Sequence, residues 1–380
     1  MNFTLDEKHR MLRKLFREFA ESEVKPLAAE IDEEERFPWE TVKKMGPLGL
    51  LGIYFPQKYG GAGADALAYA MCVEELGKVC GSTAVIVSSH LSLCCAPIYD
   101  FGTEEQKQKY LPDLLTGRKI GAFGLTEPAA GTDASATETT AVLEGDSYIL
   151  NGSKIFITNG GAAETFVIFA MTDRSQGTRG MSAFIVEKSF PGFSVGRPER
   201  KMGIRASSTA ELVMENCRVP KENLLGKEGQ GYKIALHTLD GGRIGIAAQA
   251  LGLGEGAVDE AIKYTRERMQ FGKRLSQFQW TQFQLAEMAT DMQAAQYMVY
   301  AAAAKKDAGE PYSADSAMAK LFASQKANDT VRKAVQLFGG YGYTREYPIE
   351  RMMRDAKITE IYEGTSEAQR MVIAKALGVK

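Results

Sequence analysis

Two changes in hydrophobic periodicity constrain the fold of this chain more than any other feature. Up to about residue 120, apolar residues recur at helical spacing, for example at Leu12, Leu15, Phe16 and Phe19. After that point, short strand-like runs follow one another without helices between them, and from Gly226 onward long helical stripes return. This order predicts an α+β protein with a helical domain at 1–120, an antiparallel β domain at 121–225 and a helical bundle at 226–380.

Turn signals divide the middle domain into strands. The segments 141–143, 148–150 and 154–158 are short apolar runs, separated by the turn residues at 144–146 and 151–152. The second separator is Asn-Gly, a strong hairpin signal between apolar runs. The spacing therefore predicts hairpins at both positions and favours a small antiparallel sandwich or barrel.

Composition and charge exclude several classes of function. The chain has 46 basic and 48 acidic residues, a net charge of -2, which gives no reason to expect nucleic acid or an anionic membrane as a partner. No apolar run approaches the roughly 20 residues that a membrane-spanning helix needs. The N-terminus lacks the basic-then-apolar form of a secretory signal. We therefore predict a cytoplasmic protein that does not insert into a membrane.

Metal-based and histidine-based catalysis have little support. The chain has three histidines, His9, His90 and His237, and none forms an H-E-x-x-H pair. Its five cysteines form no C-x-x-C motif and are predicted to be reduced, mostly buried thiols. We predict no metal site.

Glu363 is the strongest candidate for a general base. It follows the bulky apolar residues Ile361 and Tyr362, and it precedes Gly364, which frees the backbone, and Thr365, which can cap a helix. Burial against Ile361 and Tyr362 would raise the pKa of Glu363 by desolvation and strengthen it as a base. Such a carboxylate could remove a proton from a carbon beside a carbonyl. The alternative is an ordinary loop carboxylate before a helix.

The chain contains no conventional dinucleotide-binding motif. The glycine run GLGEG at 252–256 lies inside a helical pattern and not at a strand-to-helix turn, so it indicates close packing of helices. A Walker A motif is missing too. A dinucleotide would have to bind in another way.

Four segments nevertheless have residue types suited to a flavin dinucleotide. Hydroxyls and free amides at 123–133 could bond a polar ring edge, and an aromatic residue beside a hydroxyl at 156–160 could pack on an isoalloxazine. Arginines at 266–274 offer bidentate phosphate contacts, and glycines at 336–343 would let the backbone approach a phosphate or adenine. Each segment alone is equally well explained as a loop, a core turn or a helix end. Their joint occurrence ahead of Glu363 favours a flavin site.

These ordered blocks make the chain resemble the acyl-CoA dehydrogenase family over nearly all of its length. The matching blocks are LTEP at 125–128 with GTD at 131–133, FITN at 156–159, DGGR at 240–243, RMQFGK at 268–273, GGYG at 339–342 and IYEGT at 361–365. The short-chain, butyryl-CoA dehydrogenase-like branch is the most similar. The resemblance implies a C-terminal four-helix bundle, FAD as cofactor, and a homotetramer (a dimer of dimers) in which a neighbouring subunit completes each flavin site.

The resemblance also implies a set of site residues by position. The isoalloxazine would be lined by Phe123, Leu125, Thr126, Gly131, Thr132, Phe156, Ile157 and Thr158. The phosphates and adenine end of FAD would be held by Arg268, Phe271 and Gln279. The adenosine part would be contacted across a subunit interface by Gln336, Gly339 and Gly340. The site would be completed by Thr365 and Glu367. The acyl-CoA would contact Thr132, Asp240, Arg243 and Gly364. Glu363 falls on the family's catalytic base.

The activity implied by the resemblance is α,β-dehydrogenation of a short-chain acyl-CoA to a trans-2-enoyl-CoA, with electrons passed to an electron-transfer flavoprotein. Phe156 stands where many relatives have Trp, a change that we expect to tune spectrum or potential without abolishing flavin binding. Some branches place their base on the helix near Arg243. Here Gly241 and Gly242 offer no carboxylate, and Asp240 matches a substrate-contact position.

Three other interpretations stay open at this point. The same site could act in reverse as an enoyl-CoA reductase that takes electrons from a flavoprotein. It could belong to an oxidase or flavin monooxygenase, in which O₂ reoxidises the flavin, or to a non-catalytic acyl-CoA or flavin-binding scaffold that kept the fold. The residues do not determine acyl chain length and branching, physiological direction, redox potential or electron partner.

Overall fold

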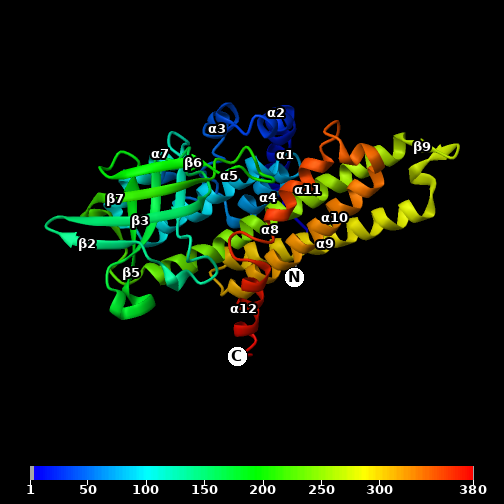
Figure 1. Ribbon diagram of the computed structural model, residues 1–380. Coiled ribbons are helices and arrows are strands. Elements are labelled where there is room, and N and C mark those ends of the chain that lie inside the picture. Colours follow the sequence, from blue (N-terminus) through cyan, green and yellow to red (C-terminus); the bar gives the residue numbers. More distant parts are fainter. Residues whose placement is uncertain (1–3, 380) are drawn as a thin grey trace.

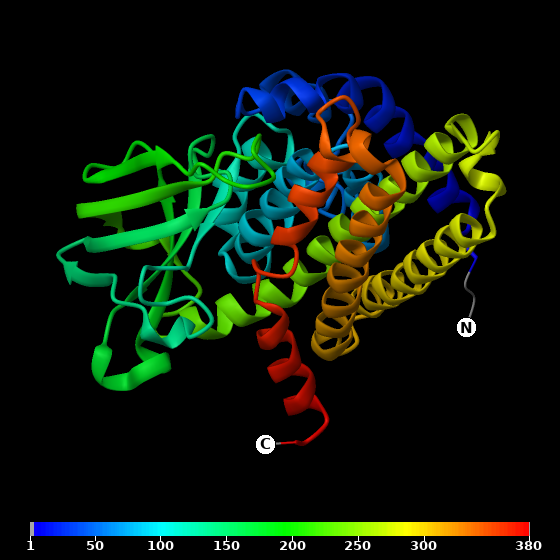
Figure 2. The same cartoon turned by 45° about the vertical axis from the view of Figure 1, so that its right-hand side comes forward.

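One long helix, α8 (Gly231–Glu267), runs through the centre of the molecule and connects its two ends (Figures 1 and 2). The computed structural model describes residues 4–379. The 37 residues of α8 correspond to about 55 Å of helix. The sheet lies at the N-terminal end of α8, and the other long helices pack along its C-terminal half (Figure 1).

The N-terminal part is helical, as predicted. Its helices are α1 (Glu7–Phe19), α2 (Ala28–Glu33), α3 (Trp39–Met45), α4 (Ala66–Gly77), α5 (Gly81–Ser89), α6 (Ala96–Phe101) and α7 (Glu104–Leu115). Between α1 and α2 the helix changes to a π-helical turn, η1 (Ala20–Val24), and a 3-10 turn, η2 (Lys25–Leu27). Pro26 lies in this break, because proline cannot donate to the helical hydrogen-bond ladder.

The stretch Gly81–Phe101 corrects the expectation about apolar length. It comprises α5, the π-helical η4 (His90–Cys95) and α6, and by length and composition it could cross a membrane. Residues 81–98 of this stretch are all buried inside the structure, including polar residues such as Ser88 and Ser92. The core position of this helix accounts for its apolar composition, because a helix in a protein core can be as long and as apolar as one that crosses a membrane.

The middle part forms one eight-stranded sheet. Its strands are β1 (Gly121–Gly124), β2 (Thr140–Glu144), β3 (Ser147–Ile157), β4 (Thr165–Met171), β5 (Met181–Glu187), β6 (Phe193–Pro198), β7 (Ala210–Pro220) and β8 (Leu224–Leu225). The order is β6-β7-β3-β2-β4-β5-β8, with β1 paired to β4. Most neighbours are antiparallel, as predicted, whereas β1 with β4 and the short contact of β2 with β4 are parallel.

One of the two predicted hairpins is confirmed and the other is wrong. The turn at 144–146 joins the antiparallel strands β2 and β3. Asn151-Gly152 instead lies inside β3, where the register against β7 shifts between Leu150 and Gly152. Gly152 has a φ of 144°, and a Cβ there would lie 2.5 Å from Oγ1 of Thr139. The dipeptide therefore forms a β-bulge, which uses the same glycine freedom that favours a turn.

The C-terminal part is a helical bundle. Besides α8 it contains α9 (Gln279–Asp307), α10 (Ser313–Phe338), α11 (Ile349–Ile358) and α12 (Ser366–Ala376). The connection between α8 and α9 carries a two-stranded ribbon of β9 (Met269–Gln270) and β10 (Lys273–Arg274), and a 3-10 turn, η9 (Gly339–Tyr343), follows α10. The last helix, α12, projects away from the body (Figure 2).

Glycines let other helices approach α8 closely, which confirms the interpretation of the run 252–256. A Cβ on Gly252 would lie 2.2 Å from the carbonyl oxygen of Glu74 in α4. A Cβ on Gly254 would lie 2.1 Å from Sδ of Met292 in α9. At Gly252 the neighbouring atom is backbone, so a Cβ would force the two helices apart, whereas at Gly254 the side chain of Met292 would have to move.

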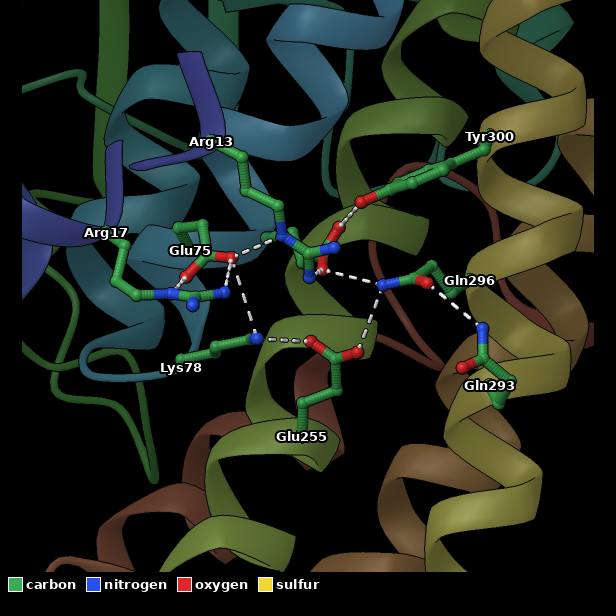
Figure 3. A network of polar contacts seen from close by, with 9 residues as sticks. Arg13, Arg17, Glu75, Lys78, Glu255, Gln293, Gln296 and Tyr300 are labelled. Atoms are coloured by element: carbon green, nitrogen blue, oxygen red, sulfur yellow. Dashed lines mark hydrogen bonds and ion pairs between the residues drawn. The ribbon is translucent and has the colours of Figure 1, made fainter. Parts of the chain in front are cut away.

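A buried charge network joins α1 to α4 and α9 (Figure 3). Arg13 Nε donates to Glu75 Oε1 at 2.8 Å, and Arg13 Nη2 donates to Glu74 Oε1 at 2.5 Å. Both carboxylates are buried. On α9, Tyr300 donates to Glu74 Oε2 at 2.6 Å and Gln296 donates to Oε1 at 3.1 Å. The first helix is thus tied to the bundle through one pair of carboxylates.

We expect Arg13→Met to destabilise the protein by on the order of 3 kcal/mol, because it leaves the buried carboxylate of Glu74 without its ion-pair partner and removes one of the cations around Glu75. Thermal unfolding followed by circular dichroism would measure the shift. The matched control is Arg36→Met, which removes exposed ion pairs with Glu30 and Glu40 and should shift the unfolding midpoint far less. Equal shifts for the two variants would contradict a stabilising role for the network.

Candidate active site

Glu363 lies in the sharp turn between α11 and α12. Its φ is 50°, and Gly364 follows with a φ of 91°. The left-handed region costs a residue with a side chain about 1–2 kcal/mol, so the surrounding structure must hold this turn. Helix α12 begins immediately afterwards, and the side chain of Thr365 caps it by accepting from the N–H of Ala368 at 3.2 Å. The predicted cap is confirmed.

The carboxylate of Glu363 points at a glycine on α8. A Cβ on Gly242 would lie 2.2 Å from Oε2 of Glu363 and 2.9 Å from Cδ2 of Leu93 in η4. Oε2 is buried and has no hydrogen-bond partner within the described residues. Burial raises the pKa of Glu363 to about 7, and the charges of Lys320 and Arg243 oppose this rise. A carboxylate in this state can accept a proton near neutral pH.

The enclosure of Glu363 arises differently from the expectation. Ile361 is 48% exposed, so it does not bury the carboxylate. Tyr362 does turn inward, and its hydroxyl donates to Oε1 of Gln249 on α8. The Nε2 of Gln249 in turn donates to the carbonyl of Gly81 at 2.8 Å. The base is therefore enclosed mainly by α8 and η4, which are distant from it in the sequence.

Two side chains donate hydrogen bonds to the carbonyls of this turn. Gln369 Nε2 donates to the carbonyl of Gly364 at 2.8 Å and to that of Glu363 at 3.3 Å. Lys320 Nζ, from α10, donates to the same Gly364 carbonyl at 2.6 Å. By contrast, the N–H of Glu363 makes no hydrogen bond to any residue of the described chain.

Asp240 and Arg243 form a pair on α8 beside Gly242. Arg243 Nη1 donates to Oδ1 of Asp240, and Ser313 Oγ donates to the same oxygen at 2.8 Å. Arg243 is buried, and its Nε–H has no partner in residues 4–379. A buried guanidinium with a free N–H retains the capacity to bind a ligand oxygen close to the base.

The structure brings the first two flavin-compatible segments together. The N–H of Ile155 in β3 donates to the carbonyl of Thr126 at 2.9 Å. Next to it, the fully buried Lys154 pairs with Glu127 (Nζ to Oε1, 2.5 Å) and donates to the carbonyl of Leu125 at 3.3 Å. The loop after β1 and the end of β3 therefore form one continuous surface.

The side chains on this surface differ in how they are exposed. Phe156 is 62% exposed and has a φ of 58°, and a Cβ on Gly131 would meet nothing within 4 Å. Phe123, Leu125 and Ile157 are buried in the core, so a ligand would meet chiefly their backbone. Partial or full exposure is found at Thr126, Thr132, Thr158, Thr365 and Glu367.

The remaining predicted flavin contacts gather at the opposite end of α8. Exposed positions there are Arg268, Phe271, Gln279, Gln336, Gly339 and Gly340. The guanidinium of Arg268 lies 5.4 Å from the ring centre of Tyr341 in η9, which brings the α8–α9 connection next to the end of α10. Phe271 is 92% exposed, and a Cβ on Gly339 or Gly340 would meet nothing within 4 Å.

The two groups do not form a single site within one chain. Arg268, the C-cap residue of α8, follows Gly242 by 268 − 242 = 26 residues. At the helical rise this places them about 39 Å apart, beyond the reach of one dinucleotide. Each group alone therefore holds only part of the predicted flavin contacts.

The residues present fit a flavin dinucleotide when the two halves are considered together. One half offers an exposed aromatic ring, Phe156, beside open backbone at Gly131 and the unpartnered acceptor of Glu363. The other half offers a guanidinium, Arg268, beside open glycines, a combination suited to phosphates. An aromatic ring, a phosphate-binding cation and a base are thus all among the residues of this chain.

Comparisons with known proteins agree with this geometry. Family models match for the acyl-CoA dehydrogenase N-terminal domain at residues 6–118, the middle domain at 122–217 and the C-terminal domain at 229–378. A short-chain specific acyl-CoA dehydrogenase of Clostridium acetobutylicum is 63% identical, covering 98% of this chain and 99% of the relative. The acryloyl-CoA reductase (NADH) of Anaerotignum propionicum is 53% identical, covering 99% and 95%.

Solved structures show the same fold. Butyryl-CoA dehydrogenase from Megasphaera elsdenii has a TM-score of 0.98 at 51% identity, covering 99% of this chain and 100% of that one. A chain from work on the electron transferring flavoprotein of Acidaminococcus fermentans and flavin-based electron bifurcation has a TM-score of 0.98 at 58% identity, covering 99% of each. An acyl-CoA dehydrogenase from Bacillus anthracis complexed with FAD has a TM-score of 0.93 at 37% identity, covering 98% and 67%.

Fold and site define an FAD-dependent oxidoreductase that acts on a CH–CH bond. The chain belongs to the acyl-CoA dehydrogenase family. The implied fold and cofactor are confirmed, whereas the exact domain limits at 120 and 225 stay predictions.

The residues that surround Glu363 but lie far from it along the chain were not identified from the sequence. Gly242 entered only as a position without a carboxylate, although its missing side chain makes room for the base. Lys320 and Gln369 were not considered. Lys320 carried a usable signal, because it occupies a core position in a helical stripe of small residues, Ser316, Ala319, Ala323 and Ala327. A charged residue at such a position needs an explanation.

We expect Gly242→Ala to lower the rate of substrate-dependent flavin bleaching by about 100-fold, because the new Cβ displaces the carboxylate of Glu363. Stopped-flow absorbance would measure the rate, and FAD content should stay close to that of the wild type. Gly241→Ala is the matched control, since the nearest atom to its Cβ would be the flexible end of Lys306 at 3.2 Å. A wild-type rate in Gly242→Ala would contradict the assigned position of the base.

Proposed function

We propose that this protein catalyses the α,β-dehydrogenation of a short-chain acyl-CoA to the trans-2-enoyl-CoA and passes the electrons to an electron-transfer flavoprotein. The observation that carries the proposal is the buried, unpartnered carboxylate oxygen of Glu363 above Gly242. Support for the substrate and partner comes from the short-chain specific relative and from the match to a chain studied with an electron transferring flavoprotein.

In this mechanism Glu363 removes the α-proton of the acyl-CoA. The α-proton is too weakly acidic for a solvated carboxylate, so the base must be strengthened by burial and the developing negative charge on the thioester oxygen must be stabilised. The unbonded N–H of Glu363 is the donor that the chain offers for that charge. Bound FAD supplies the acceptor for the hydride that leaves the β-carbon.

Residues around the base would orient the substrate. Arg243 and Asp240 on α8 would contact the CoA portion, with Thr132 on the loop after β1 near the thioester. Gly364 has a φ of 91°, which lets the backbone turn close to that thioester. These contacts would fix the α-carbon against Glu363, and a fixed geometry contributes much of the rate.

The flavin site would be completed by a second copy of this chain. On one copy, Phe123, Leu125, Thr126, Gly131, Thr132, Phe156, Ile157, Thr158, Thr365 and Glu367 would surround the isoalloxazine side. The second copy would supply Arg268, Phe271, Gln279, Gln336, Gly339 and Gly340. The separation of about 39 Å between the two groups along α8 supports this division. We infer a homotetramer built as a dimer of dimers.

Glu363→Gln should keep FAD and CoA binding and lose flavin bleaching by substrate, because the amide cannot take the α-proton. Stopped-flow absorbance with butyryl-CoA measures the bleaching, and calorimetry measures CoA binding. Glu350→Gln, which removes a carboxylate paired with Arg354 on α11, is the control and should bleach normally. Bleaching of Glu363→Gln at the wild-type rate would exclude Glu363 as the base. It would also favour a protein that binds acyl-CoA without this chemistry.

The reverse reaction is a second candidate function, because the acryloyl-CoA reductase is 53% identical over 99% of this chain. One site catalyses both directions, so the redox partner decides. We expect faster turnover of butyryl-CoA with a dye acceptor than of crotonyl-CoA with reduced electron-transfer flavoprotein. The opposite ratio would identify an enoyl-CoA reductase, and rapid O₂ consumption by the substrate-reduced enzyme would instead support an oxidase.

A further inference from the structure

Lys320 is a buried cation aimed at the backbone of the base. It projects from α10, has no exposed surface, and donates from Nζ to the carbonyl of Gly364 at 2.6 Å. No carboxylate forms an ion pair with it in residues 4–379. Its surroundings on α10 are small residues, so nothing on its own helix compensates the charge.

A hydrogen bond alone does not explain a lysine at this position. Gln369 already donates to the same carbonyl at 2.8 Å, so a neutral side chain can serve as donor. Burying an ammonium without a paired carboxylate costs several kcal/mol. The positive charge must therefore act on something nearby that benefits from it.

The charged groups around Lys320 indicate which acid its positive charge stabilises. Acidic groups acting on Lys320 are Glu363, Glu360 and Glu367, and the like charge of Arg243 opposes them. Glu367 is exposed, and Glu360 pairs with Lys357 at 2.6 Å. Glu363, in contrast, is enclosed and has an oxygen without a partner. Of these three acids, Glu363 is therefore the one whose negative charge is balanced neither by solvent nor by an ion pair.

The other groups that face Glu363 are less able to stabilise its charge. Arg243 on α8 is engaged with Asp240. Tyr69 on α4 and the neighbouring Tyr362 stay protonated at neutral pH, because burial raises the pKa of both. Lys320 is therefore the cation around Glu363 that has no ion-pair partner of its own among the described residues.

We propose that Lys320 is a positioning residue for proton abstraction: it holds the Glu363–Gly364 turn through the Gly364 carbonyl, and its charge favours the ionised form of the Glu363 carboxylate. The consequence for activity rests on the proposed function of Glu363 as base. The left-handed φ values of both turn residues, 50° and 91°, explain why this backbone needs a second anchor besides Gln369.

The test separates charge from hydrogen bonding. Lys320→Met removes both, Lys320→Gln keeps a donor without charge, and Lys320→Arg keeps the charge. The matched control is Lys326→Met on the same helix, where the lysine instead pairs with Asp291 on α9 at 3.1 Å. For each holoenzyme, infrared titration of the protonated carboxyl band, differenced against the same protein carrying Glu363→Gln, reports the ionisation midpoint of Glu363.

The expected sign follows from the direction of the effect. A cation lowers the pKa of Glu363, so Lys320→Met and Lys320→Gln should raise the midpoint by about 1 pH unit or more. Because the base must be ionised, the rise of flavin bleaching with pH should move upward by the same amount. Lys320→Arg and Lys326→Met should keep the wild-type midpoint. In the plateau above the midpoint, Lys320→Gln should bleach faster than Lys320→Met, because it retains the donor.

Unchanged midpoints in both neutral variants would overturn the electrostatic role, as would an equal rise in Lys320→Arg. Equal plateau rates in Lys320→Met and the wild type would overturn the anchoring role. The infrared midpoint reports on Lys320 whether or not Glu363 proves to be the base. Failure of this inference is therefore distinguishable from failure of the proposed function, which Glu363→Gln tests separately.

Discussion

The close approach of other elements to helix α8 is the constraint on which the rest of the structure depends. Gly252 and Gly254 let α4 and α9 pack against its backbone, and Gly242 leaves the space that the carboxylate of Glu363 occupies. A Cβ at any of these positions would come within about 2.2 Å of another atom. The same helix therefore organises the core and encloses the base, because glycine at these positions permits close contacts that a Cβ would disturb.

Buried charges in this protein are arranged in two different ways. Arg13 is matched to Glu74 and Glu75 in a network that joins helices, and every carboxylate there has a donor. Around Glu363 the matching is incomplete: one carboxylate oxygen has no donor, and Lys320 has no ion-pair partner within the described residues. Complete pairing stabilises a fold, whereas incomplete pairing leaves a group able to gain or lose a proton.

The length of α8 is also the reason why the proposed flavin site involves a second copy of the chain. One end of the helix lies beside the sheet and the base, and the other carries Arg268 and the open glycines after α10. A dinucleotide cannot bridge about 39 Å, so under the proposal each end of α8 presents half of a site. Under the proposed assembly, two chains complete each other's sites, which makes flavin binding depend on oligomerisation.

The sequence by itself determined the order of helical and strand-forming segments, the cap at Thr365 and the blocks that place the chain in its family. These features are local, so periodicity and residue type suffice to predict them. Asn151-Gly152 shows the limit, because the same dipeptide favours a turn and a bulge, and only pairing with β7 selected the bulge. The environment of Glu363 was decided by tertiary structure alone. Gly242, Leu93 and Lys320 come from three separate elements, and their effect on the pKa of the base exists only once folding has brought them around it.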